Sequence, residues 1–174
     1  MFKELNIMRP FFDRPEKDFA VREFAKETGI TPATASRQLK EMKEAGLLSY
    51  RKERILDLYK ANFDSASYRD LKAYYNIRKI RESGLLEALD GFYLKPAVLL
   101  FGSAAFGMDT STSDFDIVVI SENTKAFPET AKFEKKLGRE IQLFVVKDIR
   151  ALKNDHLVNS ALNGIVLQGE IKWI

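Results

Sequence analysis

The chain has 174 residues, of which 45% are apolar and 30% are charged, a composition typical of a globular protein with one or two domains. The absence of cysteine excludes disulfides and thiolate metal sites, and the lack of a long apolar run or a signal-peptide core leads us to expect a cytoplasmic protein with no membrane partner. Residues 1–83 hold 18 basic and 13 acidic residues, whereas residues 84–174 hold 10 and 12, so we expect the first part to face nucleic acid.

The first part of the chain is predicted to begin with three helices. Apolar residues at helical spacing predict helices over residues 2–13 and 21–28, and Gly29 is placed to end the second. Thr31 is a suitable N-cap and Pro32 occupies the first position of a third helix, which runs to about residue 45. The inner face of this helix is formed by Ala35, Leu39 and Met42.

A basic hairpin follows the third helix. Residues 47–51 and 55–61 read as two strands around Lys52, Glu53 and Arg54. Two helices separated by a glycine turn, followed by this hairpin, resemble the winged helix-turn-helix domains of prokaryotic transcription regulators over residues 1–63.

This resemblance implies that double-stranded DNA is a partner and that the protein takes part in transcription regulation as a homodimer, since paired half-sites need paired subunits. The third helix would enter the major groove and the hairpin would lie near phosphates. The candidate DNA-contacting residues are Thr31, Thr34, Ser36, Arg37 and Lys40 on the helix, and Arg51, Lys52 and Arg54 on the hairpin. The alternative is a winged helix that serves only protein contact or dimerisation.

Two further helices are predicted before the most informative stretch. Residues 65–83 form a long helix whose apolar stripe includes two tyrosines, which we interpret as core or interface rather than as a platform for bases. A short helix over residues 84–93 follows. We therefore expect a winged helix-turn-helix domain over residues 1–64, a helical connector over 65–93 and a second domain over 94–174.

The stretch AVLLFGSAAFGMDTSTSDFDIVVI, residues 97–120, reads as strand, tight turn, short helix, polar loop and strand. Backbone N–H groups after Gly102 would favour an anion such as phosphate, and the Ser103 hydroxyl can donate to a phosphate oxygen. Asp114 and Asp116 are two residues apart at a strand, so both carboxylates face the same way and offer oxygen ligands to Mg²⁺. This combination predicts metal-assisted phosphoryl or nucleotidyl transfer.

The string GSxxxGxxxxxSDxD between two apolar strands resembles the signature of the DNA polymerase beta-like nucleotidyltransferase superfamily, especially its minimal members. The resemblance implies a nucleotide site that uses Gly102, Ser103, Gly107 and Ser113. It also implies that Asp114 and Asp116 are the catalytic residues and hold Mg²⁺ or Mn²⁺, with a nucleoside triphosphate such as ATP as substrate or ligand.

One position departs from the family pattern. Residues 125–137, which we expect to be helical after Pro128, lead to a strand over 141–146, which in the family usually supplies a third metal-binding carboxylate. Gln142 fits that position best, and Glu140 lies two residues earlier on the same strand face. Either Glu140 substitutes for the missing carboxylate, or Gln142 binds weakly through its amide oxygen, or the site has lost activity. The remainder is predicted as short helices over 147–151 and 155–163, and a strand over 164–168.

The expected fold class is α/β (α+β), in which a winged helix-turn-helix precedes a small nucleotidyltransferase core with a mixed sheet. Two hypotheses for function follow. The first is an Mg²⁺-dependent enzyme that transfers a nucleoside monophosphate to an acceptor hydroxyl on a protein, small molecule or RNA. Minimal members of the family can act as antitoxins that nucleotidylate a partner toxin, so the resemblance implies a toxin as one partner. The second is a DNA-binding regulator whose degenerate core only senses nucleotide.

Overall fold

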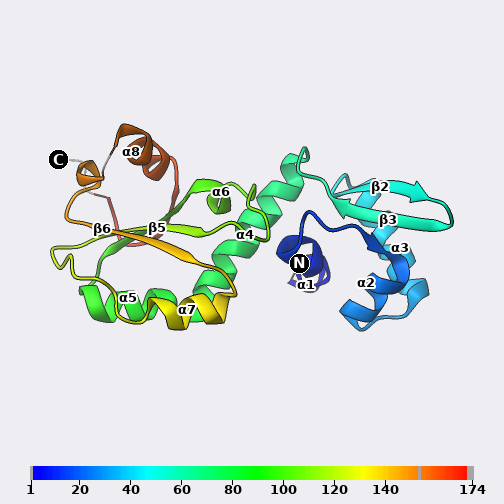
Figure 1. Ribbon diagram of the computed structural model, residues 1–174, viewed down its shortest axis with the longest axis horizontal. Helices are drawn as coiled ribbons and strands as arrows, with labels where there is room; N and C mark the ends of the chain where they lie inside the picture. Colours follow the sequence, from blue (N-terminus) through cyan, green and yellow to red (C-terminus); the bar gives the residue numbers. More distant parts are fainter. Residues whose placement is uncertain (1, 153, 172–174) are drawn as a thin grey trace. The chain divides into compact units, whose positions relative to one another are not determined.

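The computed structural model describes residues 2–152 and 154–171, and it consists of two compact units that divide between Tyr75 and Asn76 (Figure 1). The division falls within helix α4 (Ala66–Ser83), which therefore contributes residues to both units. Within the described ranges, no helix is both long enough and apolar enough to cross a membrane.

The first unit is a helix-turn-helix with a small antiparallel sheet. Its elements before α4 are α1 (Phe2–Asp13), β1 (Phe19–Ala20), α2 (Val21–Thr28), α3 (Pro32–Glu44), β2 (Leu48–Glu53) and β3 (Leu56–Ala61). The strands lie in the order β1-β3-β2, and the predicted hairpin is the β2–β3 pair. Strand β1 was not predicted, because two residues are too short to show an alternating pattern.

Aromatic side chains fill the core of this unit and fix its first helix. The rings of Phe11 and Phe19 pack edge to face with centroids 5.0 Å apart. The last carbonyls of α1 have no partner inside the helix. The Tyr68 hydroxyl donates to the carbonyl of Phe11 at 2.9 Å, and the buried Lys72 ammonium donates to that of Phe12 at 2.7 Å. Helix α4 thus supplies the hydrogen-bond donors that the end of α1 needs.

The second unit is built on a mixed four-stranded sheet in the order β6-β5-β4-β7. After the end of α4, its elements are α5 (Leu85–Tyr93), β4 (Ala97–Phe101), α6 (Gly102–Ala105), β5 (Phe115–Ile120), α7 (Thr130–Leu137), β6 (Ile141–Val146), a 3₁₀ turn η1 (Ile149–Ala151), α8 (Asp155–Leu162) and β7 (Ile165–Gln168). Strand β4 pairs antiparallel with β5 and β7, whereas β5 and β6 are parallel. The predicted fold class, including the mixed sheet, is confirmed.

Helices cover both faces of this sheet, which explains the continuous apolar run of β4. Figure 1 shows α5 and α7 on one face and α8 on the other. Along β5, Phe115, Ile117 and Val119 point into the core beneath α5 and α7. Val118 belongs to the core on the α8 side, and Asp116 shares its face by strand alternation. The register of β5 therefore places one carboxylate at the start of an otherwise apolar face.

Candidate functional site

At the turn after β4, the backbone lies very close to an acidic side chain of the candidate site. Gly102 adopts a φ of +69°, in the left-handed region that side chains disfavour. It lies beside the carboxylate of Asp116, because Phe101 and Asp116 are register partners in the β4–β5 pair. A Cβ atom at residue 102 would stand 2.2 Å from Asp116 Oδ2, a distance no real contact allows. Glycine is thus required both by the backbone angle and by the neighbouring carboxylate.

Asp114 and Gln142 form the other side of the site. Asp114 immediately precedes β5, and its Oδ2 accepts a 2.8 Å hydrogen bond from the Gln142 amide nitrogen. Gln142 is also the register partner of Asp116 in the parallel β5–β6 pair. Glu140 lies one residue before β6, where its backbone carbonyl accepts from the Phe115 N–H at 2.9 Å. An amide side chain therefore lies next to both aspartates, and a metal-binding role for Gln142 or Glu140 stays a prediction.

The electrostatics of the pair suit a bound cation. The pKa of Asp116 is raised, first by partial burial and second by the negative charge of Asp114. The two carboxylates carry like charges that repel each other, so a divalent cation such as Mg²⁺ bound between them would stabilise the pair. The two carboxylates are the kind of donor set that fits such a cation. Among the described residues there is no cluster of three or more acidic or histidine side chains, so the remaining ligands would come from water and substrate.

The loop between α6 and β5 holds the other two residues predicted to bind nucleotide. Gly107 is buried with a φ of +63°, and the N–H of the residue after it donates to the Ser103 carbonyl at 2.9 Å. The Ser113 hydroxyl accepts from the Thr110 N–H at 2.9 Å. In the structure both residues shape the loop that ends at Asp114, and their contact with nucleotide stays a prediction.

A buried ion pair anchors this loop, and sequence reasoning did not find it. The carboxylate of Asp109 is fully buried and pairs with Arg139 at 2.7 Å. Asn76, near the middle of α4, donates to the same carboxylate at 2.8 Å and to the carbonyl of Ala104 at 2.9 Å. Arg139 also donates to the carbonyl of Thr110, and its guanidinium lies over the Phe115 ring. The network joins both ends of the loop that carries Asp114.

The predicted recognition helix lies in the first unit with the expected inner face. The residues Ala35, Leu39 and Met42 are buried, and Thr31 is the N-cap, accepting from the Thr34 N–H at 3.2 Å. The other candidate residues of α3, Ser36, Arg37 and Lys40, are half-buried or exposed. Their contact with DNA is not tested by the structure, but their side of the helix is the one left uncovered.

The β2–β3 hairpin presents its basic residues unequally. Arg51 donates to Asp18 at 3.1 and 3.2 Å and pairs with Glu53 at 2.5 Å, and the bonds to these carboxylates raise its pKa. Lys52 and Arg54 are exposed near the tip, where Arg54 has a φ of +54°. A phosphate would compete with two carboxylates for Arg51, so Lys52 and Arg54 are the stronger candidates for phosphate contact.

Comparison with known families assigns both units. The family model described as "Nucleotidyltransferase domain" matches residues 82–167. The model described as "Bacterial regulatory protein, arsR family" matches residues 5–50. The chain therefore joins an ArsR-type helix-turn-helix domain to a nucleotidyltransferase domain. A search of curated protein sequences finds no match to the chain. The two family matches support nucleotidyl transfer together with DNA binding.

The carboxylate pair of the nucleotidyltransferase domain should lower its stability without a cation. Because the pKa of Asp116 is raised by folding, the folded state binds a proton more tightly than the unfolded state, and stability is lost as the pH rises through that pKa. We expect Asp116→Asn to raise the melting temperature at pH 7.5 in EDTA, with the gain disappearing toward pH 4. Asp70→Asn is the control on an exposed carboxylate. A variant that melts lower at pH 7.5 would contradict the assigned electrostatics.

The Asp109–Arg139 pair should stabilise the nucleotidyltransferase domain strongly. Arg139→Met leaves the buried Asp109 carboxylate without its cation, which costs about 3 kcal/mol of unfolding free energy. Denaturant unfolding measures the loss, and Arg139→Met combined with Asp109→Leu should recover part of it. Lys132→Met removes an exposed cation from the same domain as a control. Equal stabilities of Arg139→Met and Lys132→Met would show that the pair contributes little.

Proposed function

We propose that the nucleotidyltransferase domain transfers a nucleoside monophosphate from a nucleoside triphosphate to a hydroxyl group of an acceptor. The observation that carries the proposal is the position of Asp116 against Gly102, which brings a carboxylate to the turn where phosphates are expected. In this reaction the acceptor oxygen bonds to the α-phosphorus while the bond to the β-phosphate oxygen breaks, so pyrophosphate leaves.

The residues of the site have two proposed roles, binding of the phosphates and binding of a metal ion. The backbone N–H groups after Gly102 are proposed to bind a phosphate, and the Ser103 hydroxyl is proposed to donate to a phosphate oxygen. Asp114 and Asp116 would hold Mg²⁺, which neutralises negative charge on the phosphate oxygens. The buried Asp109–Arg139 pair holds the intervening loop, so Asp114 reaches the site on an anchored segment.

The acceptor hydroxyl is proposed to lie on a separate protein, of which a partner toxin is one example. The helix-turn-helix domain is proposed to bind double-stranded DNA as a homodimer through α3 and the β2–β3 hairpin. The match to the arsR family supports the DNA-binding part of this proposal.

The bond between Gln142 and Asp114 favours a second candidate function. An amide cannot accept a proton as a general base, and its Nε2 donates to the carboxylate expected to bind metal. In this alternative the domain binds nucleotide without turnover, and the bound nucleotide alters DNA binding. The protein would then be a regulator that senses nucleotide.

Transfer of label from ATP tests the first candidate directly. With α-³²P-labelled ATP, Mg²⁺ and an extract of the source cells, we expect the protein to label an acceptor. Asp114→Ala and Asp116→Ala should reduce labelling by about a hundredfold or more, because a bound metal contributes several kcal/mol to such reactions. Asp70→Ala is the matched control. Labelling that survives both substitutions would contradict the assigned site.

Restoring a carboxylate distinguishes the two candidates. Gln142→Asp returns an acidic group beside Asp116, and we expect it to raise the transfer rate by about 10²- to 10⁴-fold, the range of general-base catalysis. A wild-type protein that transfers no label, yet whose DNA affinity shifts with ATP, would favour the sensor instead.

Salt dependence tests the DNA-binding part. Phosphate contacts make the logarithm of the binding constant fall linearly with the logarithm of salt concentration. We expect Lys52→Ala and Arg54→Ala each to reduce the slope for a random-sequence duplex by about 0.9. Lys132→Ala, an exposed lysine of the nucleotidyltransferase domain, should leave it unchanged. Binding that ignores ionic strength would contradict phosphate contact.

A further inference from the structure

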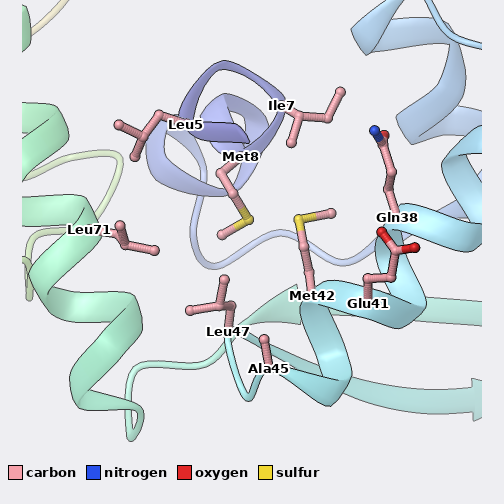
Figure 2. A pocket seen from close by; sticks show the side chains of 9 residues that line it. All are labelled: Leu5, Ile7, Met8, Gln38, Glu41, Met42, Ala45, Leu47 and Leu71. Carbon is pink, nitrogen blue, oxygen red and sulfur yellow. The ribbon is translucent and has the colours of Figure 1, made fainter. Parts of the chain in front are cut away.

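An apolar pocket of about 390 Å³ lies inside the helix-turn-helix unit, between α1, α3 and α4. Figure 2 shows the side chains that line it, contributed by these three helices and by the turn into β2. The lining residues are Leu5, Ile7, Met8, Gln38, Glu41, Met42, Ala45, Leu47 and Leu71. Neither family match nor the nucleotidyl-transfer site accounts for this space.

The size and lining of the pocket suit a small organic molecule. Pockets that hold such ligands usually measure roughly 300–1,000 Å³ and combine apolar walls with a few polar groups. The volume and the lining of this pocket agree with that description. Met8 and Met42 face each other across the space with their thioether groups (Figure 2). Because methionine is flexible and polarizable, this pair can adapt to the shape of a bound ring.

One polar group in the pocket lacks a partner. The Gln38 side-chain oxygen is buried, and within residues 2–152 and 154–171 it accepts no hydrogen bond. A buried acceptor without a donor destabilises a protein, so such a group is usually satisfied by a partner or by bound solvent or ligand. The group that would satisfy it is an N–H or O–H donor.

The charge at the pocket also selects among ligands. Glu41 lines the pocket with its carboxylate, and its side chain is 64% exposed, which places it at the mouth. The guanidinium of the exposed Arg37 lies 3.8 Å from this carboxylate. An anionic ligand would meet this carboxylate, whereas a neutral or cationic ligand would not be repelled.

We propose that this pocket is a binding site for a small aromatic or aliphatic molecule that is neutral or cationic and carries one N–H or O–H donor. The donor bonds to the Gln38 oxygen, and the apolar part fills the space between Met8, Met42 and Leu71. The site lies against the C-terminal part of α3 and is separate from the nucleotide site, so it does not depend on the nucleotidyl-transfer proposal.

Two fluorescent probes of matched shape test the proposal. N-phenyl-1-naphthylamine carries an N–H donor, and 1-benzylnaphthalene replaces that group by CH₂. We expect saturable one-to-one binding of the amine to the full chain, and a two- to tenfold preference for it over the hydrocarbon, the value of about one hydrogen bond. Gln38→Leu should abolish this preference while the protein still binds the hydrocarbon.

Variants that fill the pocket provide the second arm. Ala45→Trp places a large ring at the pocket wall and should weaken binding of the amine at least tenfold. Ala33→Trp adds the same ring to an exposed position of α3 outside the pocket and should leave binding unchanged. Circular dichroism checks that each variant is folded. The preference for the amine over the hydrocarbon is measured on the wild-type protein, so that part of the test does not depend on any variant.

Three results would overturn the proposal. The first is an amine that does not saturate the wild-type protein, and the second is equal affinity for the two probes. The third is a pocket closed by a second copy of the chain, which would appear as a dimer that Ala45→Trp dissociates while neither probe binds the wild type.

Discussion

The Asp116 carboxylate occupies the space in which a side chain at residue 102 would stand. This close approach constrains the whole second unit, because it needs a glycine at the end of β4, an exact β4–β5 register and a left-handed backbone angle at one residue. The sheet order β6-β5-β4-β7 supplies the register, and helices on both faces make it rigid. The site is therefore a consequence of how two central strands are paired.

Buried polar groups fix the loop next to the contact between Gly102 and Asp116, because this loop is not part of the sheet. The loop from Gly107 to Asp114 has no regular structure of its own, and irregular backbone is costly to order. The Asp109 carboxylate provides a fixed point, because it forms an ion pair with Arg139 and accepts a hydrogen bond from Asn76. The position of Asp114, and so the spacing of the two acidic groups, depends on this network rather than on the motif alone.

The motif residues could be predicted because their pattern is local. The strands, the glycine and serine at their turn, and the two aspartates all lie within residues 97–120. The winged helix is indicated by the Thr31–Pro32 helix start and by a basic hairpin. The Asp109–Arg139 pair could not be predicted in this way, since its partners are 30 residues apart and neither position is distinctive. The pairing of Arg51 with Asp18 could not be predicted for the same reason. It makes Arg51 a weaker candidate for phosphate contact than the other basic residues of the hairpin.

The most instructive residue is Gln142. Its amide takes the place beside Asp116 where the family usually has a carboxylate, and it binds Asp114 instead of repelling it. The pKa of Asp116 is already raised, first by burial and second by the charge of Asp114, and an amide at residue 142 adds no further negative charge beside the pair. The proposed metal site thus has less negative charge than the family pattern would give it, and the effect of this difference on cation binding separates the proposed enzyme from the proposed nucleotide sensor.

Diffraction from crystals soaked with Mn²⁺ and a non-hydrolysable ATP analogue tests the central claim most directly. We expect anomalous density for Mn²⁺ between Asp114 and Asp116, with the triphosphate against Gly102 and Ser103. Metal or triphosphate bound elsewhere, or no density at this turn under saturating conditions, would contradict it.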